Sequence, residues 1–348
     1  MEKCRMDQIK TIKPICVIVA AVLLAACFSA CTDNDRKSVS YFDLFDTVIT
    51  LTAYADDRTF EMMNEEAKAI FERCNMLFDI YTEYDGMNNL ATVNRMAGEW
   101  VEVETEIIGL LEMGVEFERL TKGSVNVAMG AVLKLWHECR INAEAEPEKA
   151  RIPERHELVE ASYHCDINSI LIDKDRGAVM LADPKMSVDV GAIGKGYAAD
   201  KASKKLKEYE APFLLNCGGA VLANGLKPGN TEWEAGIDDP FGNGFIAKVG
   251  MRNCALSTSG SYLRKFSADG TEYGHIIDPN TLMPASGFEL VSVTVYGENA
   301  ACVADALSTA CYILDYEDGI ALIEEIDAEA VFVSKDGTIS FTEGFPKR

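Results

Sequence analysis

The chain is 348 residues long, 48% of its residues are apolar, and its formal net charge is −23 at pH 7. This length and composition suit a globular enzyme with a large core, and the strong acidity argues against nucleic acid as a partner. A phosphate-binding site in so acidic a chain requires local positive charge, which a metal ion, a helix N-terminus or a placed lysine can supply.

The first 26 residues have the pattern of a lipoprotein signal peptide. Four basic residues precede an apolar run from Ile15 to Ala26, and a lipobox ends this run at Leu24-Ala25-Ala26-Cys27. The run has about a dozen residues, whereas a membrane-spanning helix needs roughly 20. We therefore predict that residues 1–26 are cleaved and that Cys27 carries the lipid, palmitate included. A second lipobox ends at Cys31 and is weaker, because Phe28 fits its first position less well than Leu.

A lipid on Cys27 would anchor the protein to the cell membrane at its extracytoplasmic face. The polar residues 27–40 are predicted to be a tether, and residues 41–348 the functional domain. Residues 1–26 carry a net charge of +2, so their removal leaves the mature chain at −25.

Beyond Cys31 the chain has seven cysteines, and none of them belongs to a CxxC pair. Scattered single cysteines in apolar surroundings usually act as small buried side chains, whereas a disulfide framework is dense in cysteine. We therefore expect core cysteines and a reducing or anaerobic habitat.

The first half of the domain is predicted to be mainly helical. A β-rich run from Tyr41 to Ala55 predicts one strand. Apolar residues then recur at spacings of three and four, which predicts helices over residues 60–78, 107–120 and 127–139.

The second half is predicted to be rich in strands. Short β-type runs between Gly, Asp, Asn and Pro predict strands at residues 169–172, 178–181, 187–190, 213–216, 233–237 and 291–295. Two helices, at residues 195–207 and 300–314, interrupt them. Because strands and helices do not alternate as in a doubly wound fold, the pattern indicates an α+β class with mixed α/β texture and antiparallel hairpins.

The most glycine-rich motif spans residues 187–200, SVDVGAIGKGYAAD. Its glycines let the backbone approach a ligand, the following helix N-terminus offers partial positive charge, and Lys195 adds a full charge where phosphates would lie. The glycine spacing and the Gly after Lys195 match neither a Walker loop nor a dinucleotide fingerprint. Taken alone, such a motif is more often an ordinary turn than a phosphate site.

A second motif runs from Ser257-Thr-Ser-Gly-Ser-Tyr262, through a hairpin predicted at Asp269-Gly270, to His275-Ile-Ile-Asp-Pro279. A histidine before an Asp-Pro turn is most often a packed strand residue. Beside phosphates, His275 could instead orient a substrate or move a proton.

The third motif, residues 301–309 (ACVADALST), lies on the last predicted helix. Asp305 and Thr309 stand at i and i+4, so they share one face and present two hard oxygen ligands of the kind Mg²⁺ binds. In most helices this spacing means only a solvated Asp and a Thr bonded back to the backbone. The small and apolar neighbours indicate a buried helix here, on which Asp305 needs a partner.

These three motifs occur together and in order, and in this the chain resembles the ApbE family of FAD:protein FMN transferases. The matching stretches are residues 189–200 (DVGAIGKGYAAD), Thr258–Tyr262 with His275–Pro279, and residues 304–309 (ADALST). Weaker matches extend the resemblance over nearly the whole mature chain. It implies an ApbE-like fold in which a helical N-terminal part packs on the sheet-rich part, with the flavin site between them.

The resemblance also implies a set of site residues. Magnesium would be bound by Asp305, Thr309 and the backbone oxygen of Ala192, and His275 would be catalytic. The FAD site would be lined by Phe45, Tyr84, Ser124, Val125, Asn126, Asp189, Lys195, Ser259 and His275.

Five positions depart from the usual pattern of the family. Asn126 stands where an aspartate is usual, so it keeps an oxygen but lacks the charge, and Phe45-Asp46 replaces Met-Gly before Thr47. Ser261 replaces an acidic or amide residue, and Leu282 replaces a glycine. These changes affect the fit of the cofactor rather than the class of reaction.

The resemblance implies that the chain transfers the FMN part of FAD to a Thr or Ser hydroxyl of a target protein, releases AMP and depends on Mg²⁺. The targets would be extracytoplasmic subunits of membrane redox pumps or flavin-dependent reductases. Two alternatives stay open at this point. One is a metal-dependent FAD pyrophosphatase that delivers FMN to water, and the other is a non-catalytic, lipid-anchored flavin or solute carrier, which would not need the Asp305 and Thr309 pair. An inactive structural lipoprotein would leave His275 and Lys195 unexplained.

Overall fold

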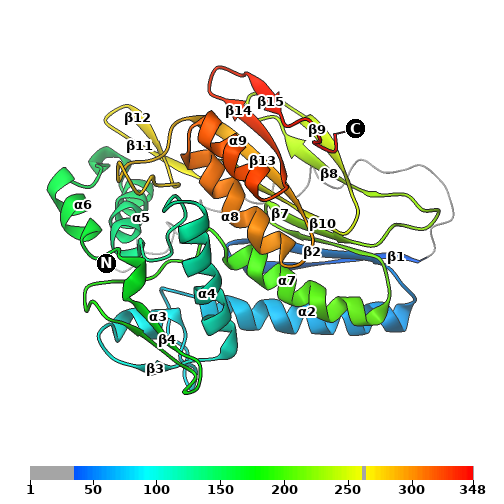
Figure 1. Cartoon of the computed structure of the whole chain (residues 1–348), viewed down its shortest axis with the longest axis horizontal. Helices are drawn as coiled ribbons and strands as arrows, with labels where there is room; N and C mark the ends of the chain where they lie inside the picture. The colour runs from blue at the N-terminus through cyan, green and yellow to red at the C-terminus, as the bar shows by residue number, and fades with distance from the viewer. Residues whose placement is uncertain (1–34, 261–263, 348) are drawn as a thin grey trace, which may run out of the picture. The chain divides into compact units, whose positions relative to one another are not determined.

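An eight-stranded antiparallel sheet forms the centre of the computed structural model, which describes residues 35–260 and 264–347 (Figure 1). Its strand order is β1-β2-β6-β7-β10-β13-β14-β15. The bounds are Arg36–Leu44 for β1, Thr47–Tyr54 for β2, Phe213–Cys217 for β6, Ala220–Asn224 for β7, Cys254–Gly260 for β10, Phe288–Tyr296 for β13, Glu329–Ser334 for β14 and Ile339–Phe341 for β15. Strand β13 is buried along nearly all its length, and after Glu289 it continues as an uncharged run of Leu, Val, Ser and Thr.

Helices cover one face of this sheet. They are α2 (Asp57–Phe78), α7 (Gly194–Leu206), α8 (Ala300–Ile313) and α9 (Tyr316–Glu325). Helix α8 packs on the central strands β10 and β13, and α7 packs between α8 and α2 (Figure 1). Helix α8 is buried on almost every side, so most of its residues are small or apolar, and Asp305, Ser308 and Thr309 are its polar exceptions.

The close packing of α7 on α8 depends on Gly196. A Cβ atom placed on Gly196 would lie 2.3 Å from the carbonyl oxygen of Ala301. No side chain larger than hydrogen fits at this distance, so the glycine of the Lys195-Gly196 pair has a packing role.

A hairpin of β8 (Trp233–Asp238) and β9 (Phe245–Met251) packs against apolar side chains of the sheet, including Leu256 and Leu290. Its alternation of buried and exposed residues is that of a strand with one solvated face. The remaining elements include a small sheet of β3 (Val101–Glu102), β5 (Ala178–Leu181) and β4 (Ile170–Asp173), with α3 (Leu90–Arg95) and α4 (Thr105–Leu120).

A further core unites helical and sheet-rich segments distant in sequence. Helices α5 (Gly130–Ala145) and α6 (Arg155–Ser162) pack with a hairpin of β11 (Lys265–Ala268) and β12 (Thr271–Gly274). Trp136 of α5 donates a hydrogen bond from Nε1 to the carbonyl oxygen of Leu282, 3.0 Å away. This contact fixes α5 against the loop that follows His275.

The predicted class and most predicted elements are confirmed, with four corrections. The strand expected over residues 41–55 is the hairpin β1-β2, because Phe45 and Asp46 both adopt left-handed φ angles of 53° that end the first strand. Residues 36–40, expected in the tether, lie in β1 and pair with β2. The third helix begins at Gly130 rather than Val127.

The fourth correction concerns residues 187–190, which form no strand. The side chain of Asn94 accepts a hydrogen bond from the amide of Val188 and donates one to its carbonyl, and the amide of Asp189 bonds to the carbonyl of Val127. The backbone is therefore satisfied by one side chain and one loop instead of a strand ladder.

The predicted signal peptide, Cys27 and Cys31 lie outside the described residues. Within the described part, no helix has the length and apolarity that crossing a membrane requires. The seven cysteines at positions 74, 139, 165, 217, 254, 302 and 311 are free, and all but Cys165 are buried, as expected for core residues.

Candidate active site

The site is organised around Asp305, a buried carboxylate on α8. Its side chain is 5% exposed and accepts hydrogen bonds from the amide of Gly196 at 3.1 Å and the hydroxyl of Ser257 at 3.0 Å. The Nζ atom of Lys195 lies 3.6 Å from the same carboxylate. A buried carboxylate needs such partners, and here α7 supplies two of them and β10 the third.

Hydroxyl groups lie next to Asp305. The Oγ1 atom of Thr309 donates to the carbonyl of Asp305 at 3.2 Å, and it also lies 3.1 Å from Oγ of Ser259. Ser259 is itself 2.8 Å from the hydroxyl of Ser308. The helix therefore places Asp305 and Thr309 on one face as predicted, and that face contacts Ser257 and Ser259 of β10.

The glycine-rich turn before α7 carries a backbone carbonyl oxygen that is free of hydrogen bonds within the described residues. Ala192 lies two residues before α7 and is partly exposed, and within residues 35–260 and 264–347 its carbonyl oxygen accepts no hydrogen bond. The next residue, Ile193, accepts a bond from the thiol of Cys302 on α8. The free carbonyl thus belongs to the turn that packs on the Asp305 helix.

These donors fit a magnesium ion. A carboxylate, a hydroxyl and a carbonyl are hard oxygen ligands, and Mg²⁺ binds through few protein groups while keeping water and substrate phosphates as its other ligands. In the part of the chain that is described, no group of three or more His, Cys, Asp or Glu side chains could hold a metal alone.

Two further carboxylates frame the turn. Burial raises the pKa of Asp189, which accepts the amide of Gly191 at 2.8 Å. Burial also raises the pKa of Asp200 to about 6, although this carboxylate accepts the amides of Ala301 and Cys302 and so caps the N-terminus of α8. Sequence reasoning did not select Asp200, because its partner lies 101 positions away.

His275 follows β12 and is held in one orientation by a backbone group. Its Nδ1 atom lies 3.2 Å from the carbonyl oxygen of Arg264. A carbonyl only accepts, so Nδ1 carries the proton and Nε2 of the neutral ring is left as an acceptor.

The charge state of His275 is set by its surroundings. The protein packed around the ring, then the positive charge of Arg264, lower the pKa of His275 to about 4, and Lys195 and Arg140 add to this effect. At pH 7 the imidazole is therefore neutral, and its Nε2 can take a proton.

Phe45 is linked to the His275 segment through the next residue, Asp46. Arg264 donates a hydrogen bond to the carbonyl of Asp46 at 3.1 Å, which ties the β1-β2 turn to the His275 segment. The amide of Phe45 bonds to Asn75, and its ring packs 6.4 Å from that of Phe78.

Other predicted FAD contacts are placed less directly. Tyr84 donates its hydroxyl to Asp79 at 2.9 Å. The side chains of Ser124 and Val125 are buried, at 5% and 2% exposure, so this segment can offer a ligand mainly its backbone. The amide of Asp189 bonds to the carbonyl of Val127, which brings the segment beside the glycine-rich turn.

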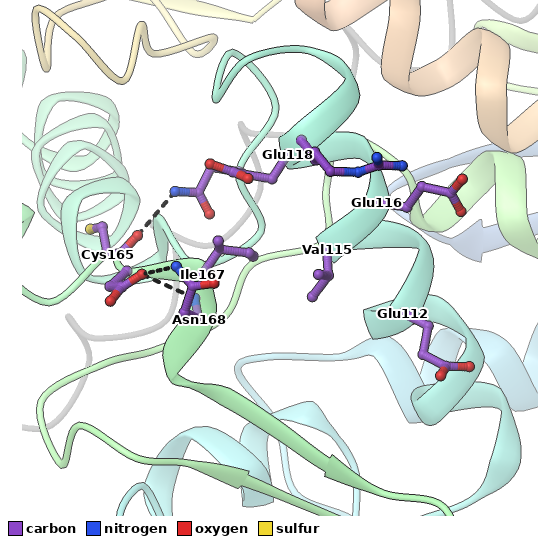
Figure 2. A pocket seen from close by; sticks show the side chains of 10 residues that line it. Glu112, Val115, Glu116, Glu118, Cys165, Ile167 and Asn168 are labelled. Atoms are coloured by element: carbon purple, nitrogen blue, oxygen red, sulfur yellow. Dashed lines mark hydrogen bonds between the residues drawn. The ribbon is translucent and has the colours of Figure 1, made fainter.

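Asn126 is one of the residues that line a pocket of about 540 Å³. Figure 2 shows this pocket from close by. The side chain of Asn126 donates to the carbonyl of Cys165 and accepts the amide of Ala128, so both its polar atoms are engaged. Acidic side chains dominate the lining, with Glu112, Glu116 and Glu118 coming from α4. Because four of the ten lining residues are acidic and one is basic, this pocket is a poor place for a phosphate group.

Comparison with known proteins identifies the family of the chain. A model described as the ApbE family matches residues 45–332. The chain is 35% identical over 277 residues to the FAD:protein FMN transferase of Treponema pallidum, covering 74% of each chain. It is 27% identical over 330 residues to the enzyme of the same name from Haemophilus influenzae, covering 91% of this chain and 90% of that one.

The chain also has the fold of solved ApbE structures. The ApbE protein of Thermotoga maritima superposes with a TM-score of 0.80 at 28% identity, covering 90% of this chain and all of that one. The flavinyl transferase ApbE of Pseudomonas stutzeri superposes with a TM-score of 0.74 at 23% identity over 88% of this chain and 95% of that one, a likeness of fold.

Proposed function

The chain belongs to the ApbE family, and from this premise we propose that it transfers the FMN part of FAD to a Thr or Ser hydroxyl of a target protein. The hydroxyl oxygen attacks the FMN phosphorus and forms a phosphoester bond, while the bond from that phosphorus to the AMP oxygen breaks and AMP leaves. Positioning and electrostatic stabilisation provide most of the rate enhancement in such a transfer.

The observation that carries this proposal is the meeting of α7 with α8. Lys195 and the N-terminus of α7 place positive charge beside Asp305 and Thr309, in a chain that is otherwise strongly acidic. Two phosphate groups of FAD can lie only where such charge is concentrated. The carboxylate proposed as a metal ligand thus lies beside the lysine and the helix N-terminus proposed to bind the phosphates.

We assign magnesium to Asp305, Thr309 and the carbonyl oxygen of Ala192. When bound, the ion would supply positive charge to the pyrophosphate and to its leaving oxygen. Lys195 then orients the phosphates, and the hydrogen bond from Gly196 keeps Asp305 turned toward α7.

His275 is assigned as the group that takes the proton of the attacking hydroxyl. Its Nδ1 is occupied by the carbonyl of Arg264, so Nε2 is the atom that accepts the proton. Neutrality at pH 7 suits this role.

We further propose that Cys27 is lipidated and that the protein acts at the extracytoplasmic face of the cell membrane. The support is the signal-peptide pattern of residues 1–27. Its targets would then be proteins exposed on that face, such as extracytoplasmic subunits of membrane redox pumps or flavin-dependent reductases.

Mass spectrometry tests the reaction directly. The chain from Thr32 onward is incubated with FAD, Mg²⁺ and a peptide bearing an Asp-x-x-Ser/Thr-Gly-Ala-Ser/Thr acceptor, and all products are weighed. A peptide heavier by one FMN, together with AMP, is expected. Free FMN and AMP with an unmodified peptide would favour the pyrophosphatase, and intact bound FAD would favour a carrier.

A further inference from the structure

Tyr81 presents an exposed aromatic ring beside the candidate site. The residue is 65% exposed and lies in the loop between α2 and α3. Its amide donates a hydrogen bond of 2.7 Å to the carboxylate of Asp79, the same carboxylate that accepts the hydroxyl of Tyr84. This hydrogen bond fixes the backbone of Tyr81, although its side chain is exposed.

One face of the Tyr81 ring packs on His137, a residue of α5. It stacks on the imidazole of His137 with ring centroids 4.8 Å apart and an interplanar angle of 26°. Such parallel stacking between residues 56 positions apart is a tertiary arrangement, and it leaves much of the tyrosine uncovered. The uncovered face of the ring is therefore available to stack with a flat ligand ring.

Arg140 fixes His137 in turn. Its NH2 group lies 3.2 Å from Nδ1 of His137, one helical turn away, while its NH1 group pairs with Glu144 at 3.3 Å. A guanidinium cannot accept a hydrogen bond, so Nδ1 of His137 is unprotonated and the neutral ring carries its proton on Nε2. The stacked rings of Tyr81 and His137 are thus fixed and uncharged, and the guanidinium of Arg140 lies beside them.

This pair lies at the rim of the candidate site. The charge of Asp189 acts on both Tyr81 and His137, and the charge of Arg140 acts on His275. In addition, α5 begins against the glycine-rich turn, because the amide of Gly130 bonds to the carbonyl of Ser187 at 3.0 Å.

We propose that Tyr81, stacked on His137 and held through Arg140, is a binding platform for one of the two flat rings of FAD, the isoalloxazine or the adenine. The inference rests on FAD being the substrate, as proposed above. Flat heteroaromatic rings stack on exposed tyrosine faces, and a preformed face loses little entropy when the ring binds. The other aromatic residues predicted for the FAD site are already engaged, since Phe45 packs on Phe78 and Tyr84 bonds to Asp79.

The test compares variants that keep or remove the aromatic face. Dissociation constants for FAD, FMN and AMP are measured by calorimetry on the full chain, for the wild type, Tyr81→Phe and Tyr81→Leu. We expect Tyr81→Leu to weaken FAD and one of the two fragments by roughly 5- to 150-fold. Tyr81→Phe keeps the face and should stay within about 2-fold of the wild type.

Two control variants separate stacking from general damage. Tyr163→Leu removes a tyrosine that is 75% exposed at the end of α6, and it should change none of the constants. His137→Gln should weaken FAD, whereas His137→Phe, which restores a flat support, should recover the affinity.

The fragment that responds identifies the ring. Weaker FMN binding, with less quenching of flavin fluorescence, assigns the isoalloxazine to Tyr81, and weaker AMP binding assigns the adenine. FAD affinity in Tyr81→Leu within about 2-fold of a wild type that binds and transfers FMN would overturn this inference alone. A wild type that does not bind FAD would overturn the proposed function and this inference together.

Discussion

Replacing Asp305 by asparagine removes one negative charge from the centre of the site while keeping the shape of the side chain. In the wild type, the carboxylate accepts the amide of Gly196 and the hydroxyl of Ser257, with Lys195 3.6 Å away. Asparagine can accept from Gly196 with Oδ1, and the hydroxyl of Ser257 can rotate to accept from Nδ2. No buried polar atom is left without a partner.

The expected cost in stability is therefore modest. Two hydrogen bonds to a charged group, each contributing roughly 1.5–3 kcal/mol, become neutral bonds of about 0.5–1.5 kcal/mol each, a loss of about 2 kcal/mol. Lys195 adds little, because its side chain is 25% exposed and the ammonium can turn to water. A domain with about 5–15 kcal/mol of stability stays folded after this change.

The expected cost in function is much larger. Asparagine offers Mg²⁺ a neutral oxygen in place of a carboxylate, so the affinity for the ion should fall at least about 100-fold and transfer should fall with it. Initial rates of FMN transfer are measured against Mg²⁺ concentration, with thermal unfolding monitored in parallel.

Asp315→Asn serves as the matched control. Asp315 is exposed and caps α9 by accepting the amide of Asp318, a role that asparagine fills equally well. The control should match the wild type in rate and in stability. If Asp305→Asn shows wild-type transfer with the wild-type dependence on Mg²⁺, the assignment of this carboxylate to the metal is wrong.

Three other changes test the site and its support. His275→Ala should abolish FMN transfer while FAD still binds. Because the pKa of His275 is lowered to about 4, protonation of this residue should not reduce the wild-type transfer rate between pH 7 and about pH 5. A fall in this rate near pH 6.5 that His275 causes would contradict this. Burial raises the pKa of Asp200 from 3.8 to about 6, so the folded state binds the proton of this carboxyl more tightly than the unfolded state does. The free energy of unfolding that Asp200 contributes below about pH 4 should therefore fall by up to roughly 3 kcal/mol as the pH rises to 6. The same pH dependence of urea unfolding in the wild type and in Asp200→Asn would refute this. Gly196→Ala should destabilise the fold by about 1–3 kcal/mol or more, because its Cβ would lie 2.3 Å from the carbonyl of Ala301, whereas Gly287→Ala, with no atom within 4 Å, should change the melting temperature little.

Local periodicity was enough to predict much of the fold. The helices over residues 60–78 and 107–120 correspond to α2 and α4, because apolar residues at spacings of three and four define one buried stripe on each. The run 187–190 shows where the same reasoning fails. Its β-branched residues suit a strand, yet Asn94 satisfies the backbone of Val188 from 94 positions away.

The family resemblance predicted which positions belong to the site, but it could not predict the direction of each side chain. It placed Ser124, Val125 and Asn126 at the flavin, whereas the fold buries the first two side chains and turns the third toward Cys165. A motif fixes which residue stands at a position, but packing of neighbouring elements decides whether that residue or its backbone is presented.

The sequence by itself determined the chemistry that one element can carry. Asp305 and Thr309 share a face because a helix repeats every 3.6 residues, and Lys195 stands at a helix start because glycines precede it. Only the tertiary structure decided that Lys195 meets Asp305, that Ser257 of β10 joins them, and that Tyr81 stacks on His137. These pairs are separated by 48 to 110 positions, and such contacts follow from sheet order and helix packing, which no local pattern of residues specifies.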